Sequence, residues 1–170
     1  MITTEPNSSL THDTETTHRL AAALRAHPFL HGFPEQYLPT LVECAMEVGF
    51  ASGEQIFREG DMANRFYLIE SGRVQLETHI RDHGDVPIQA IGAGDVLGWS
   101  WLFPPYYWHF DARALEPVRA IFLYGSRLLV HCETDRNFGY ELMKRTAAVL
   151  IQRLNSTRRE LLKARGFASG

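Results

Sequence analysis

The pattern of apolar and polar positions divides the chain into a helical, a strand-rich and a second helical region. Apolar residues recur at helical spacing from His18 to His27 and again from Pro34 to Val48, which predicts two short amphipathic helices. Between Val48 and Tyr124, short apolar runs are separated by glycines, as in strands joined by turns. After Ser126 the helical spacing returns and continues almost to the end of the chain.

The glycine-punctuated region predicts an antiparallel barrel or roll, because short strands at this spacing are typical of such folds. Phe66 and Leu68 alternate with other residues, as half-buried strands require. The segment 70–73 (ESGR) predicts a tight reversal with Gly72 at positive φ. The runs that we interpret as strands are Gln55–Phe57, Arg65–Glu70, Arg73–Ile80, Pro87–Ile91 and Val118–Tyr124.

A long helix is predicted from about Arg136 to Arg165, with a length of about 45 Å. Its apolar positions step by four and three residues, which is a heptad seam. A helix of this length extends beyond a small roll, so we expect its outer part to pair with a second copy; the alternative is a helix that lies along its own domain. The seam, and hence the expected homodimer interface, consists of Met143, Ala147, Leu150, Leu154, Thr157 and Leu161.

Composition is that of one globular domain: 170 residues, 45% hydrophobic and 22% charged. Residues 1–17 are rich in Thr and Ser and have no periodicity, which predicts a disordered leader. We therefore expect the β-roll domain with its N-terminal helices at 18–135, and the C-terminal helix with a short tail at 136–170.

Charge and cysteine content indicate which partners and which cell compartment to expect. The net charge is −3, yet residues 136–165 carry eight Lys or Arg against two Glu. Such a basic end suits nucleic acid, an acidic partner or simply a solvated helix face. No apolar run is long enough for a membrane span, and the N-terminus has no secretory signal. Two distant cysteines argue against a disulfide or zinc framework, and we expect a cytoplasmic protein.

The stretch SGEQIFREGDMANRFYLIESGRVQL, followed by IGAGDVLGWSWLF, resembles the cyclic nucleotide-binding domain, the sensor module of catabolite-activator-type (Crp/Fnr) regulators. The resemblance rests on an ordered set of residues and implies an eight-stranded, jelly-roll-like β-roll with N-terminal helices, a short phosphate-binding helix and a long C-terminal dimerisation helix. The set comprises Gly53-Glu54, Gly60-Asp61, Phe66 to Ile69, Ser71-Gly72, Gly94-Asp95 and Gly98.

Two positions depart from the members that bind cyclic nucleotides. In those members the residue after this glycine is Glu, which binds the ribose, and an Arg nine or ten residues later pairs with the phosphate. Here the first position is Trp99, and the second falls on Trp108 or His109. Losing a charged hydrogen bond and a countercharge predicts at least about a hundredfold weaker cyclic nucleotide binding.

An aromatic cluster occupies this part of the sequence, and three interpretations of it remain open. The rings fill the pocket as a core, form a slot or cage for a planar or cationic ligand, or are exposed as a partner interface. Backbone N–H groups after Gly98 are also candidates to meet a phosphate. The cluster is Trp99, Trp101, Phe103, Tyr106, Tyr107, Trp108 and Phe110.

These observations predict a non-catalytic sensor or regulatory module that signals through its C-terminal helix to a partner protein; the alternative is a structural interaction module whose aromatic pocket is self-filled. We expect no resident cofactor, metal or catalytic residue, no membrane binding and, because the chain stops at Gly170, no sequence-specific DNA binding by this chain alone. A nucleotide-like or planar small molecule is the expected ligand. Its candidate contacts are Gly98, Trp99, Ser100, Trp101, Tyr107, Trp108, His109 and Thr146.

Overall fold

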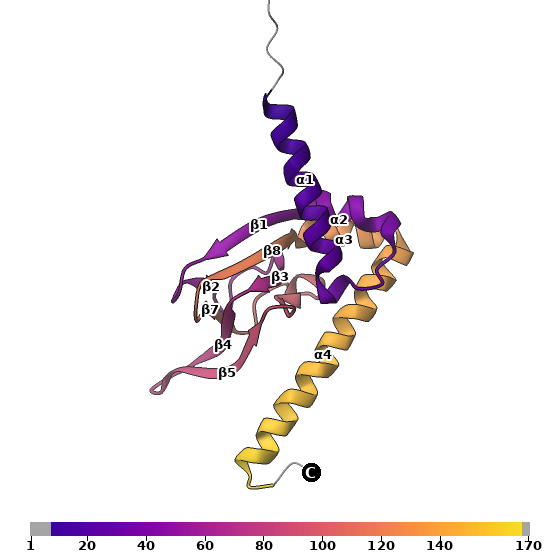
Figure 1. The fold of residues 1–170 in the computed structure, drawn as a ribbon. Coiled ribbons are helices and arrows are strands. Elements are labelled where there is room, and N and C mark those ends of the chain that lie inside the picture. The colour runs from indigo at the N-terminus through magenta and orange to yellow at the C-terminus, as the bar shows by residue number, and fades with distance from the viewer. Residues whose placement is uncertain (1–7, 168–170) are drawn as a thin grey trace, which may run out of the picture.

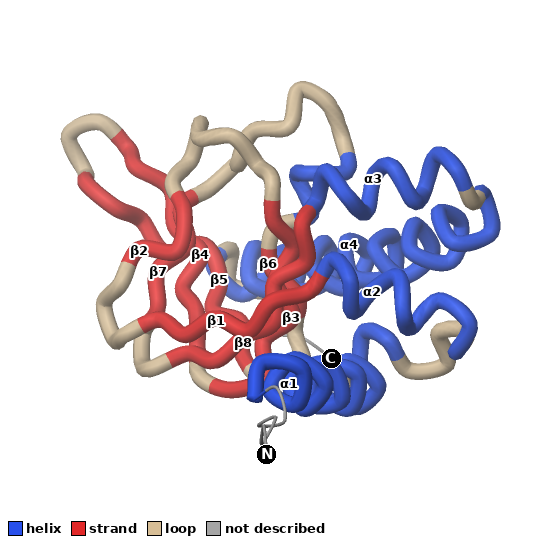
Figure 2. The backbone as a smooth tube through the Cα atoms, turned by 90° about the horizontal axis from the view of Figure 1, so that it is seen from above, coloured by secondary structure: helices blue, strands red, loops and turns tan. Residues whose placement is uncertain are grey.

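The computed structural model describes the backbone of residues 8–167 and the side chains of residues 14–167. Within this range, eight strands form two four-stranded sheets in which every strand pair is antiparallel. The two sheets face each other as a roll, and the helices gather at one side of it (Figures 1 and 2). The predicted fold class, an eight-stranded β-roll with flanking helices and a long C-terminal helix, is confirmed.

The first sheet has the order β1-β8-β3-β6 and the second the order β2-β7-β4-β5. Strands β2, β4 and β8 have the bounds that the sequence pattern indicated. Gly72 joins β3 to β4 with φ 89°, which confirms the predicted reversal. In chain order the strands are β1 (Ala45–Phe50), β2 (Gln55–Phe57), β3 (Arg65–Ser71), β4 (Arg73–Ile80), β5 (Gly84–Gly92), β6 (Val96–Leu97), β7 (Asp111–Ala114) and β8 (Val118–Tyr124).

Strand β3 separates two hydrophobic cores. Phe66 and Leu68 belong to the core between the first sheet and the helices, which we call the helix-side core. Tyr67 and Ile69 belong to the core between the two sheets, which we call the roll core. All four side chains are at most 2% exposed, so β3 is buried on both faces rather than on one. The sequence predicted a half-buried strand, but the helices cover the outer face of the first sheet and so bury the second face of β3 as well.

The N-terminal helix α1 (Ser8–Ala26) begins earlier than the sequence indicated. The expectation of a disordered leader over 1–17 is wrong from Ser8 onward; residues 1–7 lie outside the described residues. Leu20 and Leu24 pack into the helix-side core, and the guanidinium of Arg19 donates to both carboxylate oxygens of Glu47 at 2.8 and 2.6 Å. Once these turns are anchored, each further residue adds a helical hydrogen bond, which extends the helix toward its N-terminus.

The second predicted helix, Pro34–Val48, is shorter than expected. It is divided into the 3-10 turn η2 (Glu35–Tyr37) and helix α2 (Leu38–Cys44), and the chain becomes extended at Ala45, with φ −97° and ψ 145°. From Ala45 the backbone pairs with β8, beginning opposite Leu123. Strand pairing therefore overrides the helical spacing, which had placed Ala45 on a helix.

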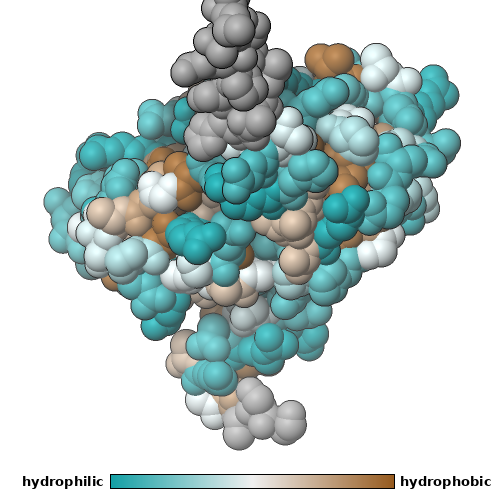
Figure 3. Space-filling model, turned by 45° about the horizontal axis from the view of Figure 1, so that its top comes forward, coloured by the Kyte–Doolittle hydropathy of each residue, from teal (hydrophilic) through white to brown (hydrophobic). Residues whose placement is uncertain are grey.

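The C-terminal half of the chain ends in α3 (Gly125–Thr134) and α4 (Arg136–Ala164). Helix α4 begins and ends within one residue of the prediction, and its outer part runs beyond the roll (Figure 1). Asp135 caps it by accepting hydrogen bonds from the N–H groups of Asn137 and Phe138. In the view of Figure 3, hydrophobic side chains form small separate areas among hydrophilic ones. None of the helices in the described range is long and apolar enough to cross a membrane.

Candidate ligand-binding site

Gly98 joins β6 to the 3-10 helix η3 (Trp99–Leu102) and adopts left-handed backbone angles, φ 86° and ψ 55°. A Cβ atom at this position would lie 2.8 Å from Cζ3 of Trp108 and 3.1 Å from the carbonyl oxygen of Arg65. Both the backbone angles and the close approach therefore require glycine. The group that approaches this glycine is the indole of the protein's own Trp108.

Trp108 lies inside the roll and is 4% exposed. Its ring stacks on Phe57, with centroids 4.0 Å apart and planes 13° apart. The backbone is held on both sides, because Trp108 N–H donates to Asp61 and Gly60 N–H donates to Trp108, each at 2.9 Å. The indole is thus a fixed part of the roll core, at the position where the resemblance places the arginine or its neighbour.

Trp99 is half-buried at the edge of the same core and packs against Phe110, with ring centroids 5.6 Å apart. The guanidinium of Arg153, from α4, lies 4.6 Å from the centre of its indole. Nη2 of Arg153 donates to the carbonyl of Val96 on β6. Burial lowers the pKa of this guanidinium to about 10, so Arg153 remains charged at neutral pH.

Ser100 and Trp101, the next two residues of η3, are buried. Trp101 belongs to the helix-side core, where its ring is 6.0 Å from that of Phe66 and its Cβ fits closely against Gly125. Both residues are at most 3% exposed. Within the described residues, the Ser100 hydroxyl and the Trp101 indole N–H have no hydrogen-bond partner.

Three further residues predicted to contact ligand point elsewhere. Tyr107 is 46% exposed, and His109 is exposed because it alternates with the buried Trp108 and Phe110. Thr146 is buried, but its hydroxyl donates to the carbonyl of Leu142 one turn earlier in α4 at 2.9 Å. The structure therefore brings Gly98, Trp99 and Trp108 together and leaves the other predicted contacts apart.

The aromatic cluster consequently occupies several environments rather than one. Trp108 and Phe110 fill the roll, Trp101 fills the helix-side core, and Trp99 lies between the roll and α4. Three rings on the η3–β7 loop are exposed, by 37 to 46%: Phe103, Tyr106 and Tyr107.

Arg113, the arginine nearest in sequence to the expected phosphate position, faces outward from β7. Its Nε donates to Glu77 at 2.9 Å, and its Nη2 lies 3.6 Å from Asp85. Its neighbours Ala112 and Ala114 face the roll core instead. No group of three or more His, Cys, Asp or Glu within the described range is placed to hold a metal ion.

The residues of the expected dimer seam lie on a side of α4 that the roll leaves open. Met143, Leu154 and Leu161 are 41%, 69% and 53% exposed. Ala147 and Thr157 lie on the same side of the helix, and Leu150 is half-buried. These positions present an apolar stripe, which a single chain does not cover.

Sequence reasoning missed two residues of the site, Phe57 and Arg153. Phe57 gave no signal beyond its place in a strand. Arg153 continues the buried stripe of α4, since Leu142, Thr146, Val149 and Arg153 step by four, three and four residues. That spacing alone would have placed the guanidinium against the roll.

Comparison with known proteins agrees with this architecture. The family model described as "Cyclic nucleotide-binding domain" matches residues 47–135, which is just over half of the chain. This chain belongs to the cyclic nucleotide-binding domain family. The match begins at Glu47 in β1 and ends at Asp135, and so contains all of the roll from β2 onward.

Among individual members of the family, a CRP-like cAMP-activated global transcriptional regulator of Mycobacterium tuberculosis is 25% identical over 130 residues. The alignment covers 76% of this chain and 56% of that regulator, so the chain spans about half the length of the curated relative it matches. The relative is named as a transcriptional regulator, not as an enzyme.

Two solved structures of family members are also similar. A protein assigned as a cyclic nucleotide-binding protein from Geobacter metallireducens GS-15 has a TM-score of 0.72 and 28% identity, covering 79% of this chain and 97% of that one. A cyclic nucleotide-binding domain from Methylobacillus flagellatus KT has a TM-score of 0.73 and 17% identity, covering 92% and 86%. The second likeness is one of fold alone.

Proposed function

We propose that this cyclic nucleotide-binding domain is a non-catalytic regulatory module that has lost cyclic nucleotide binding inside its roll and transmits its state through α4. The observation that carries the proposal is the indole of Trp108, stacked on Phe57 at 4.0 Å against Gly98. By the resemblance, a cyclic phosphate and its countercharge would lie at this position, and a side chain of this volume leaves no room for them.

The energetics favour the filled state. To admit a nucleotide, the roll would have to expel a packed indole, and removing such a side chain from a core costs about 3–5 kcal/mol. This free energy alone corresponds to more than a hundredfold in affinity, at about 1.4 kcal/mol per decade. The phosphate would then lack an arginine from β7, because Arg113 is held by Glu77 and Asp85 on the outer face.

Intrinsic fluorescence provides the test, since Trp99 and Trp108 both border the roll interior. Titration of a Trp99→Phe variant with cAMP or cGMP to about 1 mM is expected to leave its tryptophan emission unchanged, because the Trp108 indole is not displaced. Free N-acetyltryptophanamide titrated in parallel corrects for absorption by the nucleotide. A saturable change in emission at micromolar cAMP would contradict the proposal.

Helix α4 is suited to carry a signal because it contacts the roll through few groups. Arg153 reaches from α4 to the Val96 carbonyl and covers Trp99. Anything that binds one position of α4 better than another shifts the population of the two positions. A change at this contact would therefore move the outer part of the helix, which is where a second copy or a partner would detect it.

Pairing of α4 with a second copy is the expected output of the module. Leu154→Arg places a charge in the middle of the exposed stripe, so we expect this variant to elute as a monomer and the unaltered chain to elute as a dimer. Size-exclusion chromatography with light scattering measures this directly. Asn155→Arg, which adds the same charge one residue outside the seam, should remain dimeric. Dimers that survive Leu154→Arg would remove α4 as the interface.

A second candidate function is a protein-interaction module, favoured by the exposed rings of the η3–β7 loop. The Tyr106 carbonyl accepts a hydrogen bond from Ala63 N–H at 2.7 Å, and Tyr107 forms a β-bridge with Met62, which is 67% exposed. These contacts hold Tyr106 and Tyr107 in a fixed, partly apolar surface beside Phe103. This function needs neither a ligand in the roll nor a movement of α4, so it would persist in the Leu154→Arg monomer.

A further inference from the structure

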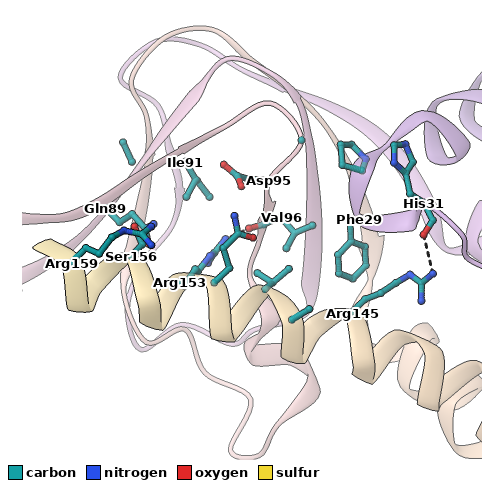
Figure 4. A pocket seen from close by; sticks show the side chains of 16 residues that line it. Phe29, His31, Gln89, Ile91, Asp95, Val96, Arg145, Arg153, Ser156 and Arg159 are labelled. Carbon is teal, nitrogen blue, oxygen red and sulfur yellow. Dashed lines mark hydrogen bonds between the residues drawn. The ribbon is translucent and has the colours of Figure 1, made fainter. Parts of the chain in front are cut away.

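A cleft of about 480 Å³ lies between α4 and the edge of the roll, outside the interior that Trp108 fills. One wall is a single face of α4, and the other is formed by the end of β5, the β5–β6 turn and η1 (Pro28–Leu30) (Figure 4). A volume of this size suits a small organic molecule. None of the eight residues predicted from the sequence as ligand contacts lines this cleft.

The cleft is basic. Arg145, Arg153 and Arg159 line it, and the acidic residue among the lining side chains is Asp95. Asp95 accepts a hydrogen bond from Gly92 N–H at 2.9 Å and makes no ion pair with any described residue, but its negative charge raises the pKa of Arg153 against the effect of burial. The three guanidiniums therefore outnumber the acids within the cleft.

The three arginines differ in whether their guanidiniums are already paired with an acidic group. Arg145 is neutralised, because it donates to Glu141 at 2.8 Å and to the carbonyl of His31 at 3.0 Å. Arg159 is exposed and forms no ion pair with the residues that the structure describes. Arg153 is 9% exposed, and its side chain points from α4 toward Asp95 in Figure 4.

The charge of Arg153 is incompletely satisfied. Nη2 donates to the Val96 carbonyl, but Nη1 is buried without a hydrogen-bond partner in the described part of the chain. A buried charged donor without an acceptor is unfavourable, and burial has already lowered the pKa of this group to about 10. An anion beside this guanidinium would supply the missing acceptor and would add its negative charge to that of Asp95.

We propose that the cleft binds a phosphorylated small molecule, whose phosphate is held by Arg153 and Arg159. Both arginines line the cleft from α4, with Gln152 and Ser156 beside them as hydrogen-bond donors. A phosphate monoester has three free oxygens and up to two negative charges, so it pairs with two guanidiniums better than a carboxylate, which has two oxygens and one charge. Phe29, Ile91 and Val149 provide apolar walls for the organic part of the ligand.

Such a ligand would contact both α4 and the β5–β6 turn, so its binding would favour one position of α4 relative to the roll. The site goes beyond the proposed loss of cyclic nucleotide binding and does not depend on it, because Trp108 and Phe57 do not line the cleft. The two proposals also fail separately: cAMP in the roll would perturb Trp108, whereas a ligand in the cleft is sensitive to Arg159.

Isothermal titration calorimetry with adenosine 5′-monophosphate, adenosine and inorganic pyrophosphate tests the cleft. Adenosine 5′-monophosphate is expected to bind, and adenosine, which lacks the phosphate, is not. Arg159→Gln should weaken the binding at least about tenfold, since it removes a charged partner of the phosphate. Arg158→Gln is the matched control: it removes the same charge from an exposed neighbour outside the cleft and should change the affinity less than about twofold.

Two results would overturn the proposal. Equal losses in Arg158→Gln and Arg159→Gln would show a diffuse attraction to the basic helix, without a site. Binding of pyrophosphate but not of adenosine 5′-monophosphate would assign the cleft to an inorganic anion. Because Arg159 is exposed, its substitution leaves the fold intact, and an unchanged melting temperature of the variant verifies this.

Discussion

Trp108→Ala is expected to lower the free energy of unfolding by about 3–5 kcal/mol, because it leaves a cavity in the roll core. The indole is 4% exposed, stacks on Phe57 and touches Gly98, so the surrounding strands have little freedom to close the space. For a domain of this size, the change is a large part of the total stability. Urea unfolding followed by circular dichroism gives the difference directly.

The neighbouring residue provides the control for this substitution. Tyr107→Ala removes an aromatic ring that is 46% exposed, so it is expected to cost less than about 1 kcal/mol. Trp108→Phe keeps part of the stacking and should lie between the two alanine variants. Equal stabilities of Trp108→Ala and Tyr107→Ala would mean that the indole does not fill the roll.

Gly98→Ala is expected to destabilise the domain by about 2–5 kcal/mol, from two sources. The left-handed backbone, φ 86°, is unfavourable for a residue with a Cβ atom, and that atom would lie 2.8 Å from the Trp108 ring. Gly53→Ala separates the sources, because Gly53 has φ 82° and a methyl group added there would meet nothing within 4 Å. Gly53→Ala should therefore lower the free energy of unfolding only by the cost of the left-handed backbone, about 1–2 kcal/mol.

A double substitution tests whether the close contact between position 98 and the Trp108 indole causes part of the stability loss in Gly98→Ala. In Gly98→Ala combined with Trp108→Ala, the methyl group no longer meets the ring, so the loss should be smaller than the sum of the two single losses by at least about 1 kcal/mol. Additive losses would show that the close approach of Gly98 and Trp108 does not determine the effect. Urea unfolding of the four proteins in parallel measures this coupling free energy.

The parts of the fold that were predictable are those in which local pattern and tertiary pairing agree. Strands β4 and β8 and helix α4 follow from their own periodicity, and each has the predicted bounds to within one residue. β1 was assigned partly to a helix because Leu38 to Ala45 has helical spacing, whereas its pairing with β8 is a contact between segments far apart in the sequence, such as Ala45 and Leu123. No local pattern reports such a partner.

The candidate site was predictable in position but not in detail. Trp99 and Trp108 could be placed beside Gly98 through the resemblance, and the structure puts them there. Trp101 could not be separated from them, because a 3-10 helix turns successive side chains to different sides and the sequence does not show which core each one reaches. The cleft could not be foreseen at all, since it is formed by α4, β5 and η1 together.

The most direct measurement is a crystal structure of the protein grown with an excess of cAMP. Our account predicts that the indole of Trp108 remains stacked on Phe57 and that no nucleotide lies between the two sheets. A structure with cAMP inside the roll, Trp108 displaced and an arginine paired with the cyclic phosphate would contradict it.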